Sequence, residues 1–120
     1  MKALLYSAWD QLEVRDVPEP KPRPGEVVVR VAAVGICGSE LEGFASRSPR
    51  RTPPLVMGHE FCGEIQEVGA GVSGYRPGDR VVVNSVISCG RFPACRDGQS
   101  HLFPAREVFG MKRPGRFAEL

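Results

Sequence analysis

The chain has 120 residues, 42% of them hydrophobic and 25% charged, and a formal net charge of +2. A chain of this length buries roughly two thirds of its unfolded surface, which is enough for one domain with a core. The small net charge argues against a nucleic-acid-binding protein. No apolar stretch is long enough to span a membrane, and the run after Met1-Lys2 does not resemble a secretory signal.

The chain contains four cysteines, and no targeting segment accompanies them. Their spacing is typical of metal ligands. Cysteines of secreted proteins pair into disulfides, whereas reducing compartments keep thiols free. We therefore expect a cytoplasmic protein with free thiols rather than a disulfide scaffold.

The first third of the chain predicts three strands. Residues 2–6 form an apolar run, and residues 12–17 alternate apolar and charged side chains, which predicts a second strand. Residues 18–25 contain four prolines and predict a stiff extended connection that ends in a turn at Pro24-Gly25. Residues 26–34 are rich in valine, which predicts a strand buried on both faces.

Two stretches carry side chains that bind metals. Cys37 follows the valine-rich strand, and His59 and Glu60 follow the run 53–58. Because both stretches lie at strand ends, we expect them to converge in a β fold. A thiol, an imidazole and a carboxylate suit a catalytic zinc ion, which keeps one coordination position open. The residues alone leave another interpretation open, in which Cys37 is a small buried apolar residue and His59 a hydrogen-bonded core histidine.

A short helix is predicted over residues 39–45, with Ser39 as its N-cap. The loop 46–54 follows, and we expect its three arginines to form a solvated surface. In a second interpretation, this loop lies at the mouth of the metal site and favours an anionic substrate such as a sugar phosphate.

The next strand is predicted over residues 61–68, and Gly69 to Gly74 then spell Gly-x-Gly-x-x-Gly. In a dinucleotide-binding motif, the third glycine opens a helix whose N-terminal amides hold the pyrophosphate. Here residues 75–79 predict a turn and residues 80–84 another strand. We therefore interpret the glycines as a strand–turn–strand connection and expect no cofactor-binding residues among them.

Residues 85–110 predict a loop-rich lobe that contains Cys89 and Cys95. Residues 116–120 predict a strand that returns to the main sheet. The sequence therefore has six or more short strands, turns rich in Gly and Pro, and little helix. This pattern predicts a mainly β fold, a partly open β-barrel with short helices.

Several motifs of the chain occur in a defined order. They are Gly-Ile-Cys-Gly-Ser-Glu at 35–40, Pro-Leu-Val-Met-Gly-His-Glu-Phe-Cys-Gly-Glu-Ile at 54–65, Val-Gly-Ala-Gly-Val at 68–72 and Arg-Pro-Gly-Asp-Arg-Val at 76–81. Together they resemble the N-terminal part of the zinc-dependent medium-chain dehydrogenase/reductase family, the alcohol and polyol dehydrogenases. The resemblance runs from residue 1 to residue 119 and implies a barrel like that of the chaperonin cofactor GroES.

The resemblance also implies a catalytic centre. Cys37 and His59 would bind one catalytic zinc ion, with Glu60 in or just behind the coordination shell. Ser39 would accept the proton of the alcohol. Glu40 stands where the family usually has aspartate, and it would orient the histidine. Zinc would act as a Lewis acid on the substrate oxygen, and hydride would pass to NAD or NADP.

Members of the resembled family often bind a structural zinc ion through four cysteines in the lobe. Here the second and fourth of these positions are Phe92 and Phe103, and two thiolates do not complete a structural zinc site. We therefore predict no structural zinc and expect the two phenylalanines to pack together. His101 would supply a third ligand, but no fourth is evident. In an oxidised sample, a disulfide between Cys89 and Cys95 is the alternative to free thiols.

We expect residues 1–120 to form one catalytic domain and the family's nicotinamide-binding Rossmann domain to lie outside this sequence. The domain would bind a small-molecule alcohol, polyol or carbonyl substrate and would be inactive alone. Its uncovered apolar face would also allow homo-oligomers. Two other functions stay open, a zinc-free quinone reductase relative and a GroES-like binding or assembly module without catalysis.

Overall fold

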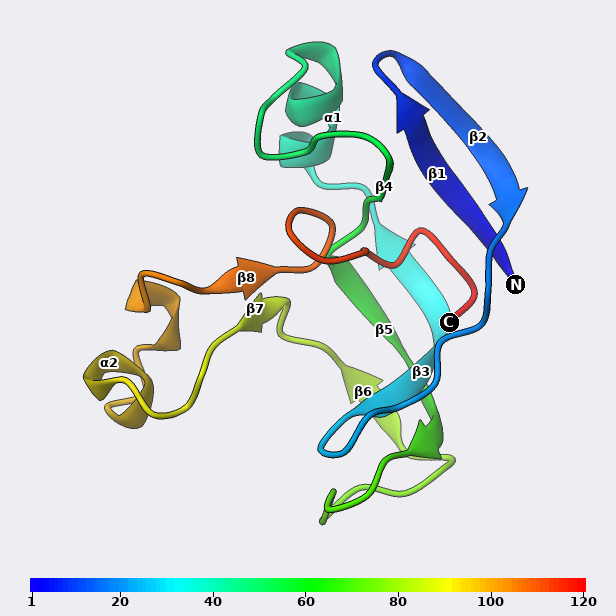
Figure 1. Ribbon diagram of the computed structural model, residues 1–120. Helices are drawn as coiled ribbons and strands as arrows, with labels where there is room; N and C mark the ends of the chain where they lie inside the picture. The colour runs from blue at the N-terminus through cyan, green and yellow to red at the C-terminus, as the bar shows by residue number, and fades with distance from the viewer.

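The structure is a computed structural model that describes residues 1–120, and it contains three small antiparallel sheets (Figure 1). The first sheet has the order β2-β1-β4, the second β3-β5-β6 and the third β7-β8. The strands are β1 Lys2–Ala8, β2 Gln11–Asp16, β3 Val27–Gly35, β4 Leu55–Val56, β5 Glu60–Val68, β6 Arg80–Val82, β7 Val86–Ile87 and β8 Glu107–Val108. The sheets do not close on one another. The fold is therefore the mainly β, partly open barrel that the sequence predicts.

The helical segments are short. They are α1 Gly38–Ala45, α2 Pro93–Arg96 and the single 3-10 turn η1 Ser100–Leu102. No helix follows the glycine-rich stretch 69–74, which leads through turns into β6, as predicted. No helix of the structure combines the length and apolarity needed to cross a membrane.

The prediction that the valine-rich strand is buried on both faces is wrong for its second half. In β3, Val28 and Val29 are buried, whereas Ala32 and Ala33 are exposed. Ala33 pairs with Cys62 of β5, which pairs with Val82 of β6, and Val82 is 86% exposed. No other element covers this end of the sheet, so a stripe of small apolar side chains faces outward.

The strand predicted over residues 116–120 is reduced to a single bridge. Ala118 pairs with Ala3, and the Leu4 amide donates to the Phe117 carbonyl at 2.7 Å. On its other side, the Val31 amide of β3 donates to the Glu119 carbonyl at 2.9 Å. This segment therefore joins the first sheet to the second, which a strand belonging to one sheet would not do.

The main core lies between β1, β4 and α1. Its buried members are Tyr6, Leu55 and Met57, and Phe44 and Phe117 pack against them. The ring of Tyr6 contacts the ring of Phe44 at a centroid distance of 5.3 Å. This core anchors α1 and the β4–β5 connection, the two segments that carry the metal-binding residues.

Candidate metal centre

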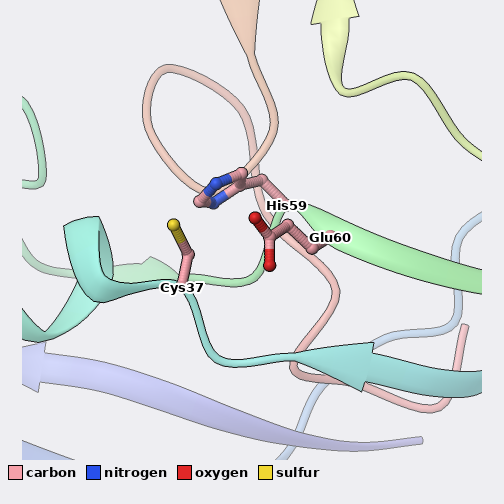
Figure 2. A group of neighbouring side chains, drawn as sticks. All are labelled: Cys37, His59 and Glu60. Carbon is pink, nitrogen blue, oxygen red and sulfur yellow. The ribbon is translucent and has the colours of Figure 1, made fainter.

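Cys37, His59 and Glu60 come together at one edge of the second sheet (Figure 2). One donor atom from each residue lies within 4.8 Å of the others. Cys37 lies two residues beyond the end of β3, Glu60 is the first residue of β5, and His59 directly precedes it. Because Gly35 pairs with Glu60 in the antiparallel ladder, the two strands deliver these side chains to the same place.

Two glycines allow the segments to approach so closely. Gly58 has a φ of +96°, which side-chain-bearing residues rarely adopt, and a Cβ there would lie 2.7 Å from the Phe117 nitrogen. At Gly35, a Cβ would lie 3.0 Å from Glu60 Oε2. Glycine at position 58 therefore permits the turn before His59, and glycine at position 35 leaves room for the Glu60 carboxylate.

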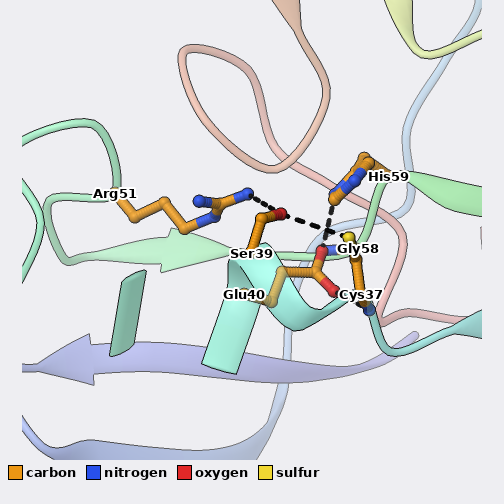
Figure 3. Close-up of polar contacts among 6 residues, drawn as sticks. All are labelled: Cys37, Ser39, Glu40, Arg51, Gly58 and His59. Atoms are coloured by element: carbon orange, nitrogen blue, oxygen red, sulfur yellow. Dashed lines mark hydrogen bonds and ion pairs between the residues drawn. The ribbon is translucent and has the colours of Figure 1, made fainter. Parts of the chain in front are cut away.

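Glu40 ties the two ligand-bearing segments together (Figure 3). Its side chain is 2% exposed and accepts hydrogen bonds from both segments. Oε2 accepts from the Cys37 amide at 3.0 Å, whereas Oε1 accepts from the Gly58 amide at 2.8 Å and lies 2.9 Å from His59 Nδ1. The buried carboxylate is thus fully partnered, and its contact with Nδ1 leaves His59 Nε2 available to a metal.

The predicted N-cap at Ser39 is wrong by two residues. α1 begins at Gly38 with Cys37 as its N-cap, because the carboxylate of Glu40, in the first turn, accepts the Cys37 amide. Ser39 lies inside the helix and its hydroxyl donates to Cys37 Sγ at 3.3 Å. The serine predicted to move a proton is therefore beside the cysteine predicted to bind the metal.

The arginines of loop 46–54 do not all form a solvated surface. Arg50 is exposed and Arg47 is paired with Asp10, but Arg51 is only 3% exposed. Arg51 Nη2 donates to Ser39 Oγ at 3.1 Å, and Arg51 Nε has no hydrogen-bond partner. Burying a guanidinium without a carboxylate partner costs free energy, and the hydrogen bond to Ser39 offsets part of that cost.

Arg51 is the residue of this site that sequence reasoning misses. Its stem lies over Gly43, where a Cβ would meet Arg51 Cδ at 2.9 Å. The small residue at position 43 of the helix is the only local signal, and it is too common to predict a buried arginine. A charged loop with two further arginines is typical of a surface.

Two residues of the metal centre, His59 and Glu60, line a wide, open hollow of about 710 Å³. The rest of its lining is mostly apolar. It includes Val34, Phe61, Val82 and Val83. A mostly apolar hollow with a few polar groups is typical of a small-molecule site.

The lobe 85–110 holds the other two cysteines that the sequence singles out. Cys89 Sγ and Cys95 Sγ lie 3.9 Å apart, and no third His, Cys, Asp or Glu donor joins them. The predicted contact of Phe92 with Phe103 is confirmed, with ring centroids 5.5 Å apart. His101 lies in η1 and belongs to no cluster of metal-binding side chains.

The sequence of this chain is similar to those of known dehydrogenases. Residues 23–120 match the model of the alcohol dehydrogenase GroES-like domain. An L-threonine 3-dehydrogenase of Pyrococcus abyssi is 44% identical over 110 residues, which are 89% of this chain and 32% of that protein.

Two solved structures have the same fold. A crystal structure of an NAD-dependent alcohol dehydrogenase superposes with a TM-score of 0.90 at 36% identity and covers 99% of this chain and 36% of that one. A putative zinc-binding dehydrogenase from Sinorhizobium meliloti 1021, bound to NADP, gives 0.86 at 39% identity, with 98% and 34% covered. The chain thus spans about a third of the length of the proteins it matches.

Proposed function

This chain belongs to the alcohol dehydrogenase GroES-like domain family, and on that premise we propose that it is the metal- and substrate-binding part of a zinc-dependent dehydrogenase. The reaction would transfer hydride between an alcohol or polyol and NAD or NADP. The single observation that carries the proposal is the cluster of Cys37, His59 and Glu60 around the buried Glu40. A segment outside these 120 residues would bind the nicotinamide.

The donor set fits zinc. Sulfur, imidazole nitrogen and carboxylate oxygen are the ligand types that zinc takes in proteins, and three protein ligands leave the open position of a catalytic site. Cys37 and His59 are half-buried, whereas Glu60 is exposed. Cys37 and His59 would therefore hold the ion, and Glu60 would be the ligand that exchanges with water or substrate.

Bound zinc would supply Lewis acidity toward the oxygen of the substrate. The protein's own contribution is orientation. Glu40 holds the ring of His59 through Nδ1, which leaves Nε2 available to the ion. Ser39 Oγ would accept the proton released by the alcohol. Arg51 Nη2 holds that oxygen in place and keeps a positive charge beside it.

The cavity next to the cluster would receive the substrate. Its apolar wall includes the neighbouring residues Ala33, Cys62 and Val82, which would offer a surface to the nicotinamide-binding part. We expect the 120-residue chain alone to show no alcohol-dependent reduction of NAD or NADP, because nothing in it would hold the nicotinamide. The cytoplasmic location stays a prediction from the sequence.

The test is the zinc content of the chain, measured by elemental analysis after purification under reducing conditions. We expect zinc at partial occupancy, at most about one per chain, and its loss in Cys37→Ala. Cys62→Ala is the matched control, because Cys62 lines the same cavity but lies outside the cluster. Zinc that survives Cys37→Ala, or a chain that never binds zinc even when extended by its second domain, would contradict the proposal. The latter result would favour a binding or assembly module.

A further inference from the structure

Two thiols of this protein lie outside the proposed metal centre and close to each other. Cys89 follows β7 and Cys95 lies in α2, with 3.9 Å between their sulfur atoms. All four cysteines of the chain are free. Cys89 is exposed and Cys95 half-buried, so a small reagent can reach the pair.

The surroundings of Cys89 favour its thiolate form. Its Sγ accepts hydrogen bonds from the amides of Arg91 at 3.4 Å and Phe92 at 3.3 Å. These bonds, with a smaller contribution from Cys95, lower the pKa of the Cys89 thiol. The thiolate is the nucleophile in thiol–disulfide exchange, so Cys89 is the thiol that reacts first.

Local packing keeps Cys95 next to Cys89. The Cys95 amide donates to the Phe92 carbonyl at 2.9 Å, and the Phe92 ring packs on Phe103. On the other side, β7 pairs with β8 and fixes the start of the segment. The turn 89–95 is thus held at both ends, with its two sulfurs facing each other.

From this geometry we propose that Cys89 and Cys95 form a reversible dithiol–disulfide site that reacts with small-molecule disulfides such as oxidised glutathione. The Cys89 thiolate attacks one sulfur of the oxidised glutathione, forms a mixed disulfide and releases one glutathione thiolate. The Cys95 thiolate then attacks Cys89 Sγ and releases the second. The two cysteine thiols are oxidised, and one glutathione disulfide is reduced to two glutathione molecules, which take up the two protons.

The site does not depend on the proposed dehydrogenase chemistry, because Cys89 and Cys95 touch neither the metal cluster nor the cavity. A metal is the competing occupant of two neighbouring thiols. A structural zinc ion needs four ligands, and no third His, Cys, Asp or Glu donor joins this pair.

The experiment incubates the reduced chain with excess oxidised glutathione, blocks the remaining thiols with iodoacetamide and maps the products by mass spectrometry. We expect free thiols to fall from four per chain to two, with a Cys89–Cys95 cross-link that dithiothreitol reverses. Cys95→Ser should stop at glutathione bound to Cys89. Cys62→Ser, which removes a half-buried thiol elsewhere, should leave the cross-link unchanged.

Three results would overturn the proposal. One is a chain that keeps four free thiols under these conditions. Another is glutathione spread evenly over all cysteines in Cys95→Ser, which would show that Cys89 is not selected. The last is zinc in the purified protein that Cys89→Ser removes and Cys37→Ala does not, since that would make the pair a metal site.

Discussion

Cys37 and Cys89 each stand two residues beyond the end of a strand, yet their surroundings differ. Cys37 is half-buried and meets a histidine and a carboxylate that arrive from another strand. Cys89 is exposed, and its partners Arg91, Phe92 and Cys95 all lie within six residues along the chain. The first region is a product of tertiary structure and the second of a local turn.

The difference shows what decides the chemistry of a cysteine in this molecule. At Cys37, the buried Glu40 holds the cysteine amide and the imidazole of His59, and so joins two distant segments. At Cys89, the hydrogen-bond partners of the sulfur are two amides and a second thiol. Substitutions that disturb the packing around α1 and the start of β5 should therefore damage the metal centre and leave the dithiol intact.

Removing the Glu40 carboxylate should have the largest effect. Glu40→Ala leaves the Gly58 amide buried without a partner, and we expect a loss of about 3–5 kcal/mol in the free energy of unfolding. Urea unfolding measures this loss. The control is Glu42→Ala on the exposed side of α1, for which we expect a change within about 0.5 kcal/mol. Equal effects of the two substitutions would contradict the role given to Glu40.

A pair of glycines separates backbone strain from close contact. Gly58 and Gly78 have nearly the same φ, +96° and +93°, but only at Gly58 would a Cβ meet neighbouring atoms within 4 Å. We expect Gly78→Ala to cost about 1 kcal/mol and Gly58→Ala about 2–3 kcal/mol, since the second also displaces Phe117. Thermal unfolding compares them. Identical losses would mean that the approach of Phe117 is unimportant.

The core beneath α1 offers a smaller effect. Tyr6 is fully buried and its hydroxyl has no hydrogen-bond partner, and this burial raises its pKa. Tyr6→Phe keeps the ring contact with Phe44 and removes the unpartnered oxygen. We expect the free energy of unfolding to stay unchanged or to rise by up to about 1 kcal/mol. A clear loss in urea unfolding would show that the hydroxyl has a partner in solution.

The smallest effect concerns the local region. Because the pKa of Cys89 is lowered in the folded chain, its thiolate forms at lower pH there than in the unfolded chain. The folded state then holds fewer protons than the unfolded state. The contribution of Cys89 to the free energy of unfolding is therefore present at higher pH and is lost as the pH falls through the folded pKa. As the pH is increased, the rate of iodoacetamide modification of Cys89 should begin to rise at a lower pH in buffer, where the chain is folded, than in urea, where it is unfolded. Coincident profiles would contradict this.

The sequence predicts the fold well where local patterns decide it. The valine-rich strand and its neighbours along the chain follow from periodicity, and the glycine-rich turn follows from its turn residues. The contact of Phe92 with Phe103 follows from the positions that the family resemblance gives them. The candidate cluster of Cys37, His59 and Glu60 also lies where the motifs place it. That these residues bind zinc stays a prediction.

Three features escape sequence reasoning, and each depends on contacts between distant segments. Cys37 rather than Ser39 caps α1, because the Glu40 carboxylate is fixed from the far side by Gly58. Arg51 is buried because Gly43 makes room for it, which a charge pattern does not reveal. The second half of β3 is exposed because no other element covers that end of the sheet, although its composition is that of a buried strand.

The alignment of β3 with β5 has a further consequence for how the two regions arise during folding. Gly35 and Glu60 must meet across a connection of more than twenty residues, so their contact forms only after a long loop has closed. A slip of one residue in this ladder would turn Glu60 to the opposite face of the sheet. Metal captured by Cys37, His59 and Glu60 would therefore report that the two strands have found their native register, whereas Cys89 and Cys95 can meet in a chain that has not.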